Sequence, residues 1–130
     1  MRSYFSENEI ADITSLLKER EKTDIECIPQ ISGIWLHDPS WQTELRLLVL
    51  PRIKLTVSRV CFQKRRQGTM GEVVKWMIRY CHNHEISQIC IQSVETEEMV
   101  NFCLKNDFRP NPLTTFEIDG RILGDYIVNL

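Results

Sequence analysis

Hydrophobic positions recur with the period of an amphipathic helix in three segments of the chain, 6–21, 71–84 and 95–108. In each segment the apolar residues lie three or four positions apart, so that they share one helical face. Ser6 and Glu9 form a capping box at the start of the first segment, because each side chain can accept a hydrogen bond from an otherwise unpaired backbone N–H. The charged sequence KEREK ends that helix on the solvent side.

Other segments alternate with the period of a β-strand. In the segment 53–62, Ile53, Leu55, Val57 and Cys61 are predicted to face the core, because polar residues separate them. The remaining strand segments are 31–36, 44–50, 87–94 and the closing 115–130, which we expect to form a hairpin around Asp119-Gly120.

The order of these elements predicts the fold class. Three short strands with tight connections in the first half indicate an antiparallel meander. A strand, a helix and a strand between residues 53 and 92 imply a parallel pair at the centre of an otherwise antiparallel sheet. We therefore expect an α/β (α+β) fold with a mixed, mostly antiparallel central sheet and helices on both faces.

Composition narrows the class of protein. The chain has 130 residues, 42% of them hydrophobic, and a formal net charge of -2. This predicts a single domain, residues 1–130, and argues against a nucleic-acid-binding protein. The start lacks the pattern of a signal peptide, and the longest apolar run, LLVL, is too short to span a membrane. We expect a cytoplasmic protein with no membrane partner.

Cysteine usage gives no sign of a metal site or a disulfide framework. No two cysteines are two residues apart, and most lie in apolar stretches. The pattern is typical of buried thiols in a reducing compartment, and we expect no metal. The five are Cys27, Cys61, Cys81, Cys90 and Cys103.

The sequence KRRQGTMGEVVKWM, residues 64–77, has features of a ligand-binding site. Three cations and Gly68 precede the second helix, which is expected to begin near Met70 or Gly71. The first N–H groups of a helix have no internal partner, and a glycine lets them approach an anion closely. The segment therefore indicates a site for a phosphate or pyrophosphate. The alternative is an ordinary solvated loop, since a lone glycine motif is a weak signal.

Two motifs at this spacing resemble the GNAT acetyltransferase superfamily. Its pattern, Arg/Gln-x-x-Gly-x-Gly/Ala, reads Arg65-Arg66-Gln67-Gly68-Thr69-Met70 here. The segment NFCLKNDF, residues 101–108, is similar to the end of a later family helix, an aromatic pair followed by Lys-x-Gly-Phe. The resemblance covers roughly residues 53 to 110 and the closing strands.

The resemblance implies a GNAT-like fold and an N-acetyltransferase that uses acetyl-CoA. An amine acceptor, a small molecule or a protein, would attack the thioester directly in a ternary complex. The cofactor's pantetheine arm would pair with backbone at Val60, Cys61 and Phe62. Phe102 would lie near the thioester and Lys105 near the nucleotide, and a homodimer is left open. The pyrophosphate would bind the backbone of Arg65, Arg66, Gln67, Gly68, Thr69, Met70 and Gly71.

Three residues depart from the family pattern. Met70 replaces the usual glycine or alanine, and Lys54 stands where some members carry a glutamate base. Cys103 stands where a tyrosine often protonates the leaving thiolate. A cysteine could donate that proton, since its ordinary pKa resembles that of the leaving thiol. The alternative role for Cys103 is a small buried hydrophobe.

The general base and the acceptor pocket have several candidates. Glu44 lies in a predicted strand and is either the base or a surface carboxylate. Trp35 and Trp41 either line the acceptor pocket or belong to the core. With the usual acid and base replaced, a second function stays open. The chain could be a CoA-binding protein of GNAT fold that transfers nothing and acts as an interaction or sensor module.

Overall fold

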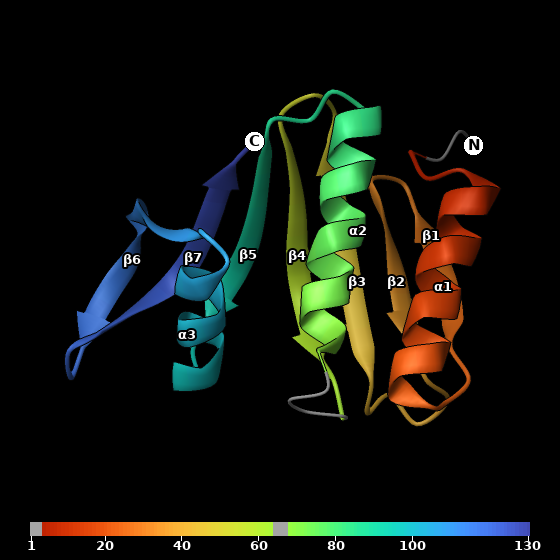
Figure 1. The fold of residues 1–130 in the computed structure, drawn as a ribbon, viewed down its shortest axis with the longest axis horizontal. Helices are drawn as coiled ribbons and strands as arrows, with labels where there is room; N and C mark the ends of the chain where they lie inside the picture. The colour runs from red at the N-terminus through yellow and green to blue at the C-terminus, as the bar shows by residue number, and fades with distance from the viewer. Residues whose placement is uncertain (1–3, 64–67) are drawn as a thin grey trace.

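A seven-stranded mixed sheet with strand order β1-β2-β3-β4-β5-β7-β6 forms the body of the molecule (Figure 1). A computed structural model of the chain describes residues 4–63 and 68–130. The elements are α1 (Glu7–Glu21), β1 (Glu26–Gln30), β2 (Gly33–His37), β3 (Glu44–Leu50), β4 (Lys54–Cys61), α2 (Thr69–Asn83), β5 (Gln88–Val94), α3 (Glu97–Lys105), β6 (Arg109–Ile118) and β7 (Arg121–Asn129).

The first half is an antiparallel meander of four strands, where three were expected. The strand that sequence analysis missed is β1, at the edge of the sheet. Its sequence ECIPQ contains Pro29, and its residues are exposed or half-buried. Edge strands tolerate proline and need no buried face, so the alternating pattern is absent there.

Strands β4 and β5 form the predicted parallel pair, joined through α2. Their register runs from Lys54 opposite Gln88 to Val57 opposite Ile91. Both strands continue further, to Cys61 and to Val94, without pairing with each other. The two strands therefore part at their carboxyl ends, and one edge of β4 has no neighbouring strand there.

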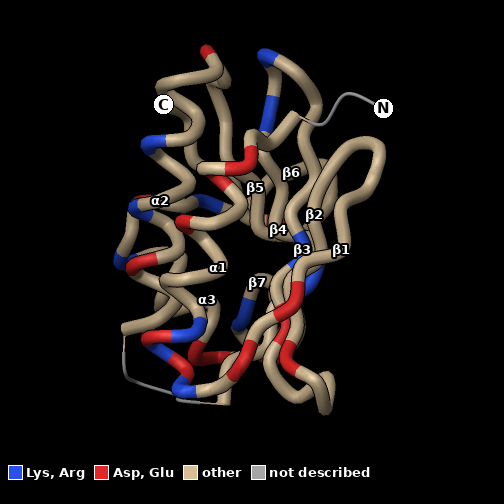
Figure 2. The backbone as a smooth tube through the Cα atoms, turned by 90° about the vertical axis from the view of Figure 1, so that its right-hand side faces the viewer, with Lys and Arg blue, Asp and Glu red and all other residues tan. Residues whose placement is uncertain are grey.

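The three helices lie on the same side of the sheet, where both sides were expected to be covered (Figure 2). The sheet residues facing them, such as Leu55, Val57 and Ile89, are fully or almost fully buried. On the opposite face, above β2 and β3, the guanidinium group of Arg46 packs over the ring of Trp35. Side chains of this kind cover apolar surface while keeping polar groups in water.

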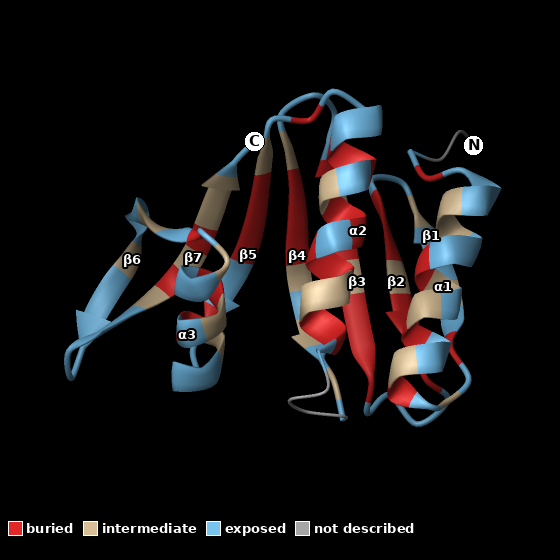
Figure 3. Cartoon of the chain, in the orientation of Figure 1, coloured by how far each residue is buried: buried red, intermediate tan, exposed pale blue. Residues whose placement is uncertain are grey.

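The helices end and pack largely as their sequences predict (Figure 3). The capping box between Ser6 and Glu9 is present. Two expectations for β4 were wrong, because Ile53 and Cys61 are exposed rather than buried. Ile53 precedes the first residue of the strand, and Cys61 lies where β4 has left β5.

The last two strands form the expected hairpin. Asp119 and Gly120 make its turn with positive φ angles of 50° and 79°. Glycine and aspartate tolerate this left-handed conformation, which tight hairpin turns require. Strand β6 is the second edge of the sheet and exposes Leu113, Phe116 and Ile118.

Candidate functional site

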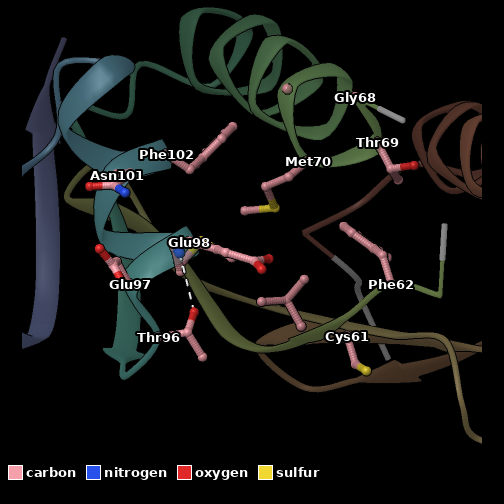
Figure 4. A pocket seen from close by; sticks show the side chains of 13 residues that line it. Cys61, Phe62, Gly68, Thr69, Met70, Thr96, Glu97, Glu98, Asn101 and Phe102 are labelled. Carbon is pink, nitrogen blue, oxygen red and sulfur yellow. Dashed lines mark hydrogen bonds between the residues drawn. The ribbon is translucent and has the colours of Figure 1, made fainter. Parts of the chain in front are cut away.

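A cleft of about 790 Å³ opens where β4 and β5 part. The end of β4 forms one wall, and the first turns of α2 and α3 form the others (Figure 4). Ligands of α/β folds commonly bind at the carboxyl ends of parallel strands, where such a gap forms. The lining residues are Val60, Cys61 and Phe62 from β4 and just after it, Gly68, Thr69, Met70 and Gly71 at α2, and Thr96, Glu97, Glu98, Met99, Asn101 and Phe102 at α3.

The cleft brings together many residues that the GNAT resemblance assigned to the cofactor. Residues 60–62, residues 68–71 and Phe102 all line it. Lys105, at the end of α3, is exposed and not among the lining residues. Arg65, Arg66 and Gln67 lie outside the described residues. The binding role of each of these residues stays a prediction.

Gly68 opens helix α2 in a conformation that favours glycine. It is the residue before the first helical position, with φ 81° and ψ 11°, and no side chain caps the helix there. The positive end of the helix dipole and the first N–H groups of α2 are therefore available to an anion. Met70, which departs from the family pattern, is buried and packs with the core while bordering the cleft.

Glu21, the last residue of α1, contacts the end of β4 and the start of α2. Its side chain is almost fully buried. One carboxylate oxygen accepts a hydrogen bond from the backbone N–H of Gln63 at 2.7 Å, and the other accepts one from Thr69 Oγ1 at 2.8 Å. Glu21 thus ties together the residues on either side of 64–67. Sequence analysis missed it, because its neighbours are charged and the helix end was expected to face solvent.

Cys103 lies in the core rather than in the cleft. Its side chain has no exposed surface, and burial raises the pKa of its thiol to about 12. A thiol with so high a pKa stays protonated near neutral pH and is a poor acid for a leaving thiolate. The placement favours the role of a buried hydrophobe.

Replacing Cys103 with alanine is therefore expected to cost about 1 kcal/mol of stability and to leave turnover nearly unchanged, because only core packing is lost. Cys103→Tyr should be more harmful, since a ring must enter a filled core. Urea denaturation and thiol-release assays would measure both variants. A folded Cys103→Ala protein with turnover reduced a hundredfold would show instead that the thiol is the acid.

Glu44 is buried, which corrects the expectation of a surface carboxylate. Trp35 Nε1 donates to one of its oxygens at 2.6 Å, and Arg59 Nε lies 3.1 Å from the other. Both oxygens are therefore engaged, one with the indole N–H and the other with a guanidinium group. Glu44 lies directly across from Cys61, on the neighbouring strand. Its contacts favour holding Trp35 and Arg59 in place over accepting a proton from a substrate.

Trp35 and Trp41 belong to the sheet face away from the helices, not to the core as an alternative had it. Trp35 is half-buried, and Trp41 is 47% exposed. Their rings meet edge to face with centroids 5.4 Å apart, and Trp41 stacks on His37 at 3.5 Å. Trp41 has a φ of 60°, which is rare for a bulky residue.

The first turn of α3 supplies lining residues that sequence analysis did not assign to the site. Thr96 caps this helix by accepting a hydrogen bond from the N–H of Met99 at 3.1 Å. Glu97 and Glu98 both line the cleft, and in Figure 4 the side chain of Glu98 extends into it whereas that of Glu97 points another way. Acidic residues in the first turn of a helix are typical partners of the helix dipole, so their residue type alone does not indicate a site. Their position just after β5, a strand that parts from its parallel neighbour, is the signal that could have found them.

Two further properties concern the part of the chain that the structure describes. None of its helices combines the length and the apolar character needed to cross a membrane. Within residues 4–63 and 68–130, no three His, Cys, Asp or Glu side chains gather in a way that could hold a metal ion.

Comparisons with known proteins give a consistent result for the fold. No family model and no curated protein matches the sequence. Among solved structures, Ard1 from Thermoplasma volcanium matches with a TM-score of 0.55 and 12% identity over 100% of this chain and 83% of that one. An acetyltransferase from Streptococcus agalactiae 2603 has a TM-score of 0.52 and 12% identity, over 95% and 76% of the two chains.

A third match extends the pattern. The IAA acetyltransferase from Bacillus cereus has a TM-score of 0.50 and 12% identity, over 96% of this chain and 85% of that one. At such identities the likeness establishes the fold. The fold consists of a seven-stranded mixed sheet with a central parallel pair and three helices. This is the architecture of the acyl-CoA N-acyltransferases, which the GNAT-like motifs of the sequence had indicated. The chain has the fold of the GNAT superfamily of acetyltransferases.

Proposed function

We propose that this protein is an N-acetyltransferase that binds acetyl-CoA in the cleft between β4 and β5. The observation that carries the proposal is the coincidence of three features in one cleft. Strand β4 has an unpaired edge, the start of α2 has no side-chain cap, and the cavity is large enough for an extended ligand. A cofactor with an amide-bearing arm and a pyrophosphate matches this combination.

The two ends of the cofactor would use different physical interactions. Beyond Val57, the backbone of β4 faces no strand on the β5 side, so the pantetheine amides could hydrogen-bond there as an added strand does. The pyrophosphate would take the N–H groups at the start of α2, where Gly68 allows close approach. The adjacent sequence Lys64-Arg65-Arg66 would add positive charge.

The reaction is a direct transfer to a primary amine. The neutral amine nitrogen attacks the thioester carbonyl carbon, a carbon–nitrogen bond forms, and the carbon–sulfur bond breaks. Backbone N–H groups at the free edge of β4 would stabilise the negative oxygen that develops in the transition state. The proton from nitrogen leaves to a base, and the coenzyme A thiolate acquires a proton.

Acetyl-CoA binding is tested by heating the protein with and without the cofactor. A ligand that binds the folded state alone must raise the melting temperature. Thiol release with a panel of amines then tests transfer. Binding without any release would support the second candidate, a CoA-binding interaction or sensor module. The placement of Cys103 in the core and the engaged oxygens of Glu44 favour that alternative.

Cys61 offers an independent test, because it is exposed and lines the cleft. We expect maleimide to label Cys61 quickly and acetyl-CoA to slow that labelling. Burial raises the pKa of the Cys81 thiol to about 12 and that of Cys90 to about 11. These thiols should react slowly with or without cofactor, since the thiolate is the nucleophile.

Mass spectrometry would identify the labelled sites, with Cys61→Ser as the control that loses the fast phase. Labelling of Cys61 at an unchanged rate under saturating acetyl-CoA would contradict the proposed position of the cofactor. Saturation would be established independently by the rise in melting temperature.

A homodimer stays part of the proposal. Edge strand β6 exposes Leu113, Phe116 and Ile118, and apolar side chains on an unpaired strand favour association with another chain. Light scattering across a concentration series would give the oligomeric state.

A further inference from the structure

The proposed reaction needs a group in the cleft that accepts the amine's proton. Among the described residues that line the cleft, three side chains can ionise: Cys61, Glu97 and Glu98. The two residues that sequence analysis put forward do not meet this need. Cys103 is closed in the core, and both oxygens of Glu44 are engaged.

Glu98 has the geometry that the others lack. Its side chain points into the cleft from the first turn of α3, and Glu97 points away (Figure 4). Glu98 is exposed, and the described part of the chain gives its carboxylate no ion pair or hydrogen bond. It is not needed to cap α3, because Thr96 already does so. The oxygens of its carboxylate can therefore accept hydrogen bonds from a ligand.

The sign of the charge says which part of a ligand Glu98 would meet. A carboxylate repels the phosphates of coenzyme A, so it does not serve cofactor affinity. The described lining residues include no lysine or arginine that would neutralise it. An amine acceptor, in contrast, is an ammonium ion at neutral pH and is attracted. The cleft thus has an anion-binding end at the start of α2 and an anionic side chain at α3.

We propose that Glu98 is the catalytic base, the residue that binds the acceptor's ammonium group and takes its proton. This inference rests on the proposed transferase function. One N–H bond of the ammonium breaks, its proton moves to the Glu98 carboxylate, and the freed nitrogen electron pair attacks the thioester carbon. The carbon–sulfur bond then breaks, and a second proton leaves the nitrogen and ends on the coenzyme A thiolate.

The test compares Glu98→Gln with Glu95→Gln. Both variants remove one exposed carboxylate near the start of α3, and Glu95 does not line the cleft. In a thiol-release assay with acetyl-CoA and the best amine of the panel, Glu98→Gln should lose about a hundredfold in kcat/KM, as expected for the loss of a general base. Glu95→Gln should behave like the parent protein.

Two readouts separate catalysis from a structural defect. The deficit of Glu98→Gln should shrink as pH rises toward the pKa of the acceptor, because a growing fraction of the amine is already neutral. Calorimetry should show acetyl-CoA bound as tightly as by the parent, or a few-fold more tightly, because a repulsive charge has gone. A damaged fold would weaken cofactor binding instead.

The outcomes distinguish the two proposals. An active parent protein whose Glu98→Gln variant keeps its rate overturns the role of Glu98 and leaves the transferase function standing. A rate deficit that is the same at every pH also overturns the role as base. A parent protein that binds acetyl-CoA and releases no thiol with any amine overturns the transferase function and, with it, this inference.

Discussion

Gly68→Glu is expected to lower the affinity for acetyl-CoA at least about a hundredfold, which corresponds to about 3 kcal/mol. Gly68 stands where the first N–H groups of α2 would meet the pyrophosphate, so a carboxylate there would both obstruct and repel the ligand. A Cβ at this position would meet the tip of the Arg20 side chain at 2.9 Å, which can move aside. The fold should therefore survive.

Two controls separate charge at the site from backbone strain. Gly68→Ala places a side chain in the same left-handed conformation, φ 81°, without adding charge, and should cost about 1 to 2 kcal/mol of stability. Gly120→Glu makes the identical change at φ 79° in the β6–β7 turn, where a Cβ meets nothing. It should not affect binding. Calorimetry that gives a folded Gly68→Glu protein its parent affinity would refute the phosphate site.

Glu21→Ala is expected to lower the free energy of unfolding by about 2 to 3 kcal/mol, because a buried donor and a partly buried donor lose their acceptor. These donors are the Gln63 N–H and the Thr69 hydroxyl. Since they lie on either side of 64–67, acetyl-CoA affinity should fall as well, even though Glu21 is not among the described cleft-lining residues. Urea denaturation would measure the first effect and calorimetry the second.

Matched variants test the assignment. Glu19→Ala removes a carboxylate from the exposed side of the same helix end and should cost much less. Thr69→Ser keeps the hydroxyl that bonds Glu21, whereas Thr69→Val removes it and should reproduce part of the loss. Equal stability of Glu21→Ala and Glu19→Ala would show that the buried contacts of Glu21 do not support the turn.

The helices and the parallel pair of strands could be predicted because their causes are local. A period of 3.6 or 2 along a segment determines which side can be buried, and Ser6 with Glu9 marks a helix start within four residues. Edge strand β1 was not predicted, because an exposed strand needs no apolar face and therefore shows no alternating pattern. Residues 60–62 and 68–71 could be assigned to the cofactor because the resemblance to the GNAT superfamily covers this continuous segment of sequence.

Only the tertiary structure decided which distant residues join that segment. Glu21 reaches Gln63 and Thr69 across more than forty residues of sequence, and Glu98 enters the cleft because β5 parts from β4 and carries α3 with it. Cys103 was a candidate because of its position in the family pattern and Glu44 because of its residue type, and burial and hydrogen-bond partners changed their expected roles. Local sequence determines which side of an element is apolar. Which elements then meet depends on how those sides pack together. That packing places the start of α2 and the Glu98 carboxylate in one cleft.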